Sequence, residues 1–230
     1  MIATMIARYL ASIIIGYFLG AIPWGLILAK KMANVDVREW GSGKIGTTNV
    51  MRSAGKKVAI LTLVLDLLKG SAAVALAGLI IGKSYVAIGP FGFGPVLAEV
   101  LAGLAAVAGH NWSIFLGFKG GSGVATFFGG WLALFPFVAI FGGEILGIGA
   151  ASTLFVSLGS IAGAVGTYAI IIPLTLFNKL PIEYLIYALA GSLIILYTHR
   201  GNIRRLVSGK ERKIGQKADK ITPPTQAQRT

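Results

Sequence analysis

The sequence predicts an all-α membrane protein with seven transmembrane helices, and three observations support this fold class. Hydrophobic residues make up 55% of the 230 residues and charged residues only 13%, about half of what soluble domains carry. Apolar runs of about 20 residues, the length that a helix needs to cross a bilayer, alternate with short polar segments. Most cationic residues gather in every second polar segment, as the positive-inside rule requires.

The predicted spans follow the apolar runs in chain order. The first run is longer than the apolar core of a signal peptide, and Lys30 and Lys31 follow it as a stop signal. The fifth span is short and begins next to Gly142 and Gly143, so a broken or re-entrant helix is an open alternative there. The spans cover residues 6–29, 59–82, 95–116, 124–142, 144–157, 158–177 and 182–198.

The distribution of lysine and arginine predicts the orientation. With the N-terminus outside and the C-terminus in the cytoplasm, seventeen of the 21 cationic side chains lie on the cytoplasmic side and three lie outside. The remaining one, Lys69, falls within the second span, and Arg8, at the outer end of the first span, is counted among the three outside. Orientation and contact with anionic lipid therefore account for the net charge of +13, and we expect no nucleic-acid partner.

The chain is expected to form one domain. Residues 1–215 make up a single integral membrane domain, and residues 216–230, which are polar and contain two prolines, are predicted to be a disordered cytoplasmic tail. The absence of cysteine excludes disulfides and thiolate chemistry, and two histidines with scattered carboxylates predict no metal site.

Two small-residue patterns are typical of close helix packing in membranes. They are Gly16-x-x-x-Gly20 in the first span and Gly159-x-x-x-Gly163 in the sixth. We expect both to act within one subunit, and a monomer is the expected state.

The first cytoplasmic loop combines glycines with hydrogen-bond donors and cations. Three glycines within six residues let backbone N–H groups approach a ligand closely, and Arg52 can bind a phosphate with two parallel hydrogen bonds. These features favour an anion site, with a flexible turn as the alternative. The loop reads Gly41-Ser42-Gly43-Lys44-Ile45-Gly46-Thr47-Thr48-Asn49.

The second cytoplasmic loop has a similar character. A glycine turn that opens a helix directs free N–H groups and the positive end of the helix dipole at an anion. Two such loops on one side of the membrane are harder to explain as simple turns than one. The segments are Gly109-His110-Asn111-Trp112 and Phe118-Lys119-Gly120-Gly121-Ser122-Gly123-Val124-Ala125-Thr126.

Polar residues near the ends of later spans extend this pattern. His199 and Asn202 share a helix face if the last helix continues, and histidine can transfer protons or donate to phosphate near neutral pH. The alternative for His199 is a simple helix cap. Ser157, near the cytoplasmic end of the fifth span, could equally be a helix-packing serine.

Asp66 and Lys69 are charged residues inside the second span. Charges in spans often mark function. We favour a structural ion pair here, because residues three apart on a helix neutralise one another easily. Glu99, in the third span, has no partner that the sequence identifies.

Together these motifs resemble the bacterial membrane glycerol-3-phosphate acyltransferases that use acyl-phosphate, the PlsY family. The resemblance extends from residue 16 to about residue 215, and four separate motifs in the same order make it specific. The residues that carry it are Gly41-Ser42-Gly43-x-Ile45-Gly46-x-Thr48-Asn49-x-x-Arg52, Asp66-x-x-Lys69-Gly70, Gly109-His110, Phe118-Lys119-Gly120-Gly121-x-Gly123-Val124-Ala125-Thr126, and His199-Arg200-x-Asn202-Ile203-x-Arg205-Leu206 followed by Gly209 and Glu211.

The resemblance implies a seven-helix enzyme of the cell inner membrane with its active site facing the cytoplasm. Such an enzyme transfers a fatty acyl group from acyl-phosphate to the 1-hydroxyl of glycerol 3-phosphate, the first step of phospholipid synthesis. Its products are lysophosphatidic acid and phosphate. Its partners are the two substrates and membrane lipid, and no cofactor is implied.

The resemblance also implies roles for individual residues. Ser42 and Arg52 would hold phosphate near the acyl donor, Lys119 would help to seat glycerol 3-phosphate, and His199 and Asn202 would orient phosphate or the reacting hydroxyl. The hydroxyl proton would pass to His199 or to a substrate phosphate oxygen. The other implied substrate-binding residues are Gly41, Gly43, Thr48, Asn49, His110, Gly120, Gly121, Gly123 and Ser157.

Two positions depart from the family's usual pattern. Ser122 stands where the family usually has a lysine, which puts one phosphate contact in doubt. Lys44 stands where asparagine is usual and could restore a positive charge.

A transporter of an organic anion or phosphate ester is the main alternative. Glycine-rich helices and intramembrane charges would suit a carrier. The absence of an internal repeat, and polar motifs at one face of the membrane, argue against it.

Overall fold

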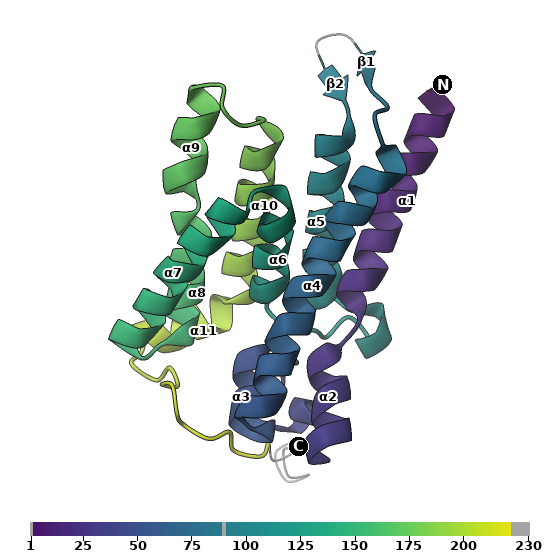
Figure 1. Ribbon diagram of the computed structural model, residues 1–230. Helices are drawn as coiled ribbons and strands as arrows, with labels where there is room; N and C mark the ends of the chain where they lie inside the picture. The colour runs from purple at the N-terminus through teal and green to yellow at the C-terminus, as the bar shows by residue number, and fades with distance from the viewer. Residues whose placement is uncertain (1, 89–90, 222–230) are drawn as a thin grey trace, which may run out of the picture.

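The structure, a computed structural model, describes residues 2–88 and 91–221 and is mostly helical (Figure 1). A short antiparallel hairpin pairs β1 (Val86–Ile88) with β2 (Phe91–Phe93). Two short 3-10 turns lie at Val37–Glu39 and Ile114–Leu116. The α-helices are α1 (Ile2–Ala21), α2 (Trp24–Ala33), α3 (Thr47–Ala54), α4 (Lys56–Ile81), α5 (Pro95–Asn111), α6 (Val124–Leu134), α7 (Pro136–Thr153), α8 (Val156–Gly166), α9 (Tyr168–Leu176), α10 (Glu183–Thr198) and α11 (Arg200–Val207).

The all-α membrane architecture predicted from the sequence is confirmed at this level. Within the described residues, five helical segments are long and apolar enough to cross a membrane. They are α1 with α2, α4, α5 with the turn after it, α7, and α8 with α9, whereas α6 and α10 are shorter apolar helices. The count of seven spans and the orientation of the termini stay predictions.

The predicted boundary between the fourth and fifth spans is wrong. The break lies at Phe135, because α6 ends at Leu134 and Pro136 opens α7. Proline is well suited to the first turn of a helix but not to its interior. Helix α7 then continues unbroken through Gly142 and Gly143, so these glycines do not form the broken helix considered above.

Small residues pack helices against one another within the chain, as expected. Gly16 and Gly20 of α1 lie directly on the backbone of α5, and Gly159 and Gly163 of α8 lie on the backbone of α7. A side chain at any of these positions would meet backbone atoms of the neighbouring helix. Both small-residue patterns therefore fix helix pairs inside one subunit.

We expect Gly163→Ala to lower the melting temperature of the purified protein. A Cβ atom there would lie 2.5 Å from the carbonyl oxygen of Gly142 and 2.8 Å from Cβ of Leu146, and overpacking of this kind costs about 1–3 kcal/mol. The matched control is Gly147→Ala, where nothing lies within 4 Å. That change should leave the melting temperature the same or raise it, since alanine is the better helix former. Equal melting temperatures for the two variants would contradict the packing described here.

An aromatic cluster joins α6 to α10. The rings of Phe127 and Tyr187 stack with centroids 5.2 Å apart, and Trp131 meets Tyr187 edge-on at 5.0 Å. The Tyr187 hydroxyl donates to the carbonyl of Phe127 at 3.0 Å. This buried cluster holds α6 in place, and with it the glycine turn at the start of that helix.

After α11, the C-terminal segment runs across to the end of the molecule where α3 lies (Figure 1). Residues 216–221, which the composition predicts to be disordered, lie against the first loop in the structure. These contacts run between backbone N–H and backbone carbonyl groups: Gly41 donates to Asp219 at 2.9 Å, Ala218 to Arg52 at 3.3 Å, and Ile221 to Glu39 at 2.7 Å. The rest of the predicted tail, residues 222–230, lies outside the described residues.

Candidate functional site

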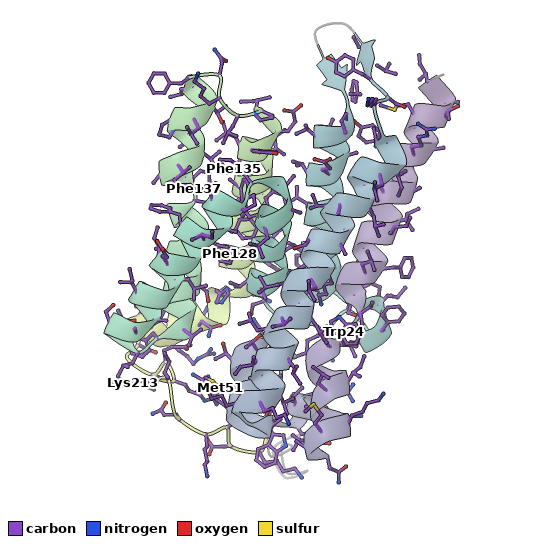
Figure 2. All side chains as sticks on the ribbon, viewed as in Figure 1. Trp24, Met51, Phe128, Phe135, Phe137 and Lys213 are labelled. Atoms are coloured by element: carbon purple, nitrogen blue, oxygen red, sulfur yellow. The ribbon has the colours of Figure 1, made fainter. Side chains whose placement is uncertain are left out.

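One cavity of about 490 Å³ contains most of the residues that the motifs singled out. Its polar end lies where the two glycine-rich loops meet α8 and α11. Its other end is apolar and extends between α4, α6 and α7. Phe128 is one of its lining residues. In Figure 2 this ring lies between Met51 and Lys213, near the lower end of the molecule, and Phe135 and Phe137, higher in the bundle. The main apolar lining residues are Leu63, Leu67, Phe128, Leu132, Ala139, Ile140 and Leu146.

The structure brings nine of the fourteen predicted site residues to this cavity. They come from the first loop, from α5, from the start of α6, from α8 and from the end of α10 onwards. These residues are Ser42, Thr48, Asn49, Arg52, His110, Gly123, Ser157, His199 and Asn202.

Four helices begin at the polar end of the cavity. The first-turn residues of α3, α6 and α8 line it, and so does His199, which precedes α11. Within the described chain none of the four N-termini has a side-chain cap. Their first N–H groups and the positive ends of their dipoles are therefore available to an anion.

Arg52 adds a positive charge to this end. Its Nη2 donates to the carbonyls of Arg212 and Lys213, at 3.1 and 3.2 Å, which fixes the guanidinium against the C-terminal segment. Its Nε is buried and has no partner among the described residues. Burial and the nearby charge of Arg212 lower the Arg52 pKa from its usual value. The negative charge of a bound anion would stabilise the guanidinium and so offset both effects.

His199 is placed as a neutral hydrogen-bond acceptor. Its Nδ1 lies 2.8 Å from the carbonyl oxygen of Ile195, and a carbonyl can only accept, so we assign the proton to Nδ1. Nε2 then carries the lone pair, and it makes no hydrogen bond within residues 2–88 and 91–221. Burial lowers the pKa of His199 and the charge of Lys44 lowers it further, against the opposing effect of the Ile195 hydrogen bond and Glu211. The neutral imidazole is therefore favoured near pH 7.

Glu211 organises three residues of the site, and the sequence reasoning gave it no role. One carboxylate oxygen accepts from Ser157 Oγ at 3.0 Å and from Asn202 Nδ2 at 2.7 Å, and the other pairs with Arg205 Nε at 2.7 Å. The side chain is only 4% exposed. A single carboxylate within a strongly basic segment was the signal that could have identified it.

His110 belongs to a buried charged cluster beside the cavity. Lys69 Nζ lies 2.8 Å from Asp66 Oδ1, 2.8 Å from His110 Nδ1 and 3.0 Å from the carbonyl oxygen of Ile22, which is freed where α1 ends. The predicted ion pair between Asp66 and Lys69 is confirmed. Since the ammonium can only donate, His110 accepts at Nδ1 and carries its proton on Nε2.

Lys119 does not reach the cavity. The chain turns through left-handed conformations at Gly117 and Phe118, with φ of 57° and 63°. The backbones of Gly120 and Gly121 are then held by the carbonyls of Asn111 and His110, both at 3.0 Å. This turn leaves Lys119 exposed on the outer side of the loop.

Four predicted glycines also lie outside the lining. Gly41 and Gly43 adopt positive φ angles of 60° and 69°, which shape the first loop. Gly120 and Gly121 lie so close to Asn111 and His110 that a side chain at either position would collide with them. Their role is to allow the close approach of backbone that brings the two loops to the cavity.

Comparisons with known proteins agree with the motifs. Residues 10–209 match the sequence profile of the family described as glycerol-3-phosphate acyltransferase. Glycerol-3-phosphate acyltransferase 3 of Dehalococcoides mccartyi (strain CBDB1) is 54% identical, over 93% of this chain and 99% of that protein. Glycerol-3-phosphate acyltransferase of Clostridioides difficile (strain 630) is 41% identical, over 93% and 99% of the two chains.

Two solved structures share the fold. The crystal structure of PlsY, an integral membrane glycerol 3-phosphate acyltransferase, in its glycerol 3-phosphate form is 36% identical, with a TM-score of 0.77 over 90% of this chain and 96% of that chain. The lysophosphatidic acid form is 34% identical, with a TM-score of 0.73 over 90% and 95% of the two chains.

Proposed function

Because the chain belongs to the glycerol-3-phosphate acyltransferase family, we propose that it transfers a fatty acyl group from acyl-phosphate to the 1-hydroxyl of glycerol 3-phosphate. The products are lysophosphatidic acid and inorganic phosphate. One observation carries the proposal: a single cavity joins an anion-attracting end, built from four helix N-termini and basic side chains, to an apolar end. Such a cavity suits two phosphates beside a fatty chain.

The reaction asks the protein mainly for positioning and electrostatic stabilisation. The substrate hydroxyl attacks the acyl carbon, the bond from that carbon to the phosphate oxygen breaks, and phosphate leaves with the electron pair. Two anionic substrates repel one another, so donors and cations that are already in place lower the barrier. No covalent intermediate with the protein is required.

Individual roles follow from the contacts in the cavity. Arg52, with Ser42 and the N-terminus of α3, holds one phosphate. Asn202 and Ser157, fixed by Glu211, complete the polar wall. His199 accepts a hydrogen bond from the reacting hydroxyl at Nε2. It takes that proton as the hydroxyl oxygen attacks, and the imidazolium then passes the proton to an oxygen of the leaving phosphate. Lys119 is left out of the proposed site because it is exposed.

The membrane setting is part of the proposal. We place the enzyme in the cell inner membrane with seven crossing helices, the N-terminus outside and the polar end of the cavity facing the cytoplasm. The positive-inside distribution supports this orientation, since the cationic first loop and α11 both adjoin that end. We propose a monomer, because the small-residue patterns of α1 and α8 pack against helices of the same chain.

A comparison of acyl donors tests the proposed reaction. With protein purified in detergent, phosphate release should require both acyl-phosphate and glycerol 3-phosphate, and lysophosphatidic acid should form in equal amount. Acyl-CoA and acyl carrier protein should support little transfer, because neither presents a phosphate at the acyl carbon. Comparable rates with acyl-CoA would overturn the assignment of the donor. Uptake of glycerol 3-phosphate into liposomes without any transfer would instead support the carrier alternative.

A further inference from the structure

Lys44 extends from the first loop to the opposite wall of the cavity. Its Nζ donates to Ser122 Oγ at 3.1 Å and to the carbonyl oxygen of Thr198 at 2.6 Å. Ser122 belongs to the second loop and Thr198 ends α10. One ammonium group thus connects three segments that are far apart in the sequence, and Lys44 itself lines the cavity.

The charge of Lys44 has no carboxylate partner in the described part of the chain. Lys69 is paired with Asp66, and Arg205 is paired with Glu211. Both partners of Lys44 are neutral oxygen atoms. An ammonium has three N–H donors, so one donor remains for a ligand in the cavity.

The surroundings of this ammonium favour an anion. Burial lowers the pKa of Lys44, and the positive charges of Arg200 and Arg205 lower it further, with Glu211 opposing them. Its neighbour Ser122 immediately precedes Gly123, after which α6 begins without a side-chain cap. On the other side, Thr198 precedes His199. A phosphate at the start of α6 would therefore meet the free donor of Lys44 close to the imidazole.

Building on the proposed function, we propose that Lys44 binds a substrate phosphate directly and closes the first loop, the second loop and the end of α10 around that anion. The shared chemistry is a phosphate dianion, which both acyl-phosphate and glycerol 3-phosphate provide. Ser122 and Thr198 hold the ammonium in position through its other two donors.

Steady-state kinetics of Lys44→Met and Lys44→Gln test this role, with Lys57→Met as the matched control. Lys57 is an exposed lysine at the start of α4, outside the cavity lining. A lost charge-assisted hydrogen bond should raise the KM for the substrate it contacts by about 10- to 100-fold. A rise confined to glycerol 3-phosphate identifies the acceptor phosphate, and a rise confined to acyl-phosphate identifies the donor phosphate. Lys57→Met should change neither KM.

Unchanged KM values for both substrates, within about twofold, in a Lys44 variant with normal thermal stability would overturn the proposal. Inorganic phosphate gives a second readout that does not need turnover. It should raise the melting temperature of the unaltered protein and of Lys57→Met, and by much less in the two Lys44 variants. Equal stabilisation of all four proteins would also overturn the role of Lys44. If the unaltered protein transfers no acyl group, the proposed function fails, whereas the phosphate experiment still decides whether Lys44 binds phosphate.

Discussion

Replacement of His199 by alanine should reduce kcat by about 100- to 10,000-fold, the range over which positioned acid–base groups contribute, while the protein still folds. The imidazole lines the cavity, and its Nε2 lone pair is left free by the hydrogen bond between Nδ1 and Ile195. Alanine removes the group that orients the reacting hydroxyl, so fewer bound substrates have the geometry for attack. The KM for glycerol 3-phosphate should change much less than kcat.

The pH dependence of the unaltered enzyme gives an independent test of the same residue. Only the neutral imidazole can accept the hydroxyl hydrogen bond. Because burial and Lys44 lower the His199 pKa below its ordinary value of 6.5, kcat/KM should hold as pH falls through 6.5 and decline only at lower pH. The residual activity of His199→Ala should lack this acidic decline.

Two measurements separate catalysis from folding in the His199 experiment. Val207→Ala, at an exposed residue at the end of α11, serves as the control and should keep the activity and melting temperature of the unaltered protein. His199→Ala should share that melting temperature approximately, since the buried ring makes its hydrogen bond only to its own helix. Turnover near that of the unaltered enzyme in a folded His199→Ala protein would refute the assigned role.

Local sequence patterns predicted the parts of the fold that local physics determines. Long apolar runs identified α4, α5 and α10. The spacing of Gly16 and Gly20 predicted close helix packing within the subunit, and the structure shows that the partner helix is α5. The boundary after α6 was misplaced because hydrophobic residues continue across it. Pro136 was the available signal for that break, since proline opens helices.

The candidate site was predictable in its residue types but not in its assembly. The two glycine-rich loops and His199 were recognised, yet the meeting of four helix N-termini depends on tertiary packing that no local pattern encodes. Glu211 and Lys44 show why. Glu211 accepts a hydrogen bond from Ser157, 54 residues away in the sequence, and Lys44 donates one to Thr198, 154 residues away. The role of Lys119 was implied by the family resemblance, and the turn at Gly117 and Phe118 leaves its side chain exposed instead.

Loss of either charge in the buried pair of α4 should destabilise the protein severely. Asp66 and Lys69 are almost fully buried in α4, a helix long and apolar enough to cross a membrane, with side chains 2% and 3% exposed. Asp66→Asn would leave an uncompensated ammonium and Lys69→Met an uncompensated carboxylate, each at a cost of about 3–5 kcal/mol. Both single variants should show much lower melting temperatures and yields from membranes.

The double variant Asp66→Asn with Lys69→Met distinguishes a charge effect from a general packing effect. It leaves no buried charge in the pair, so it should be more stable than the sum of the two single losses predicts. Recovery should be incomplete, because Lys69 also donates to His110 Nδ1 and to the Ile22 carbonyl, and both acceptors would lose their partner. Melting temperatures of the four proteins complete the cycle. Strictly additive losses would mean that the two charges are not coupled. The cluster would then be stabilised by side-chain packing and not by the attraction between the charges.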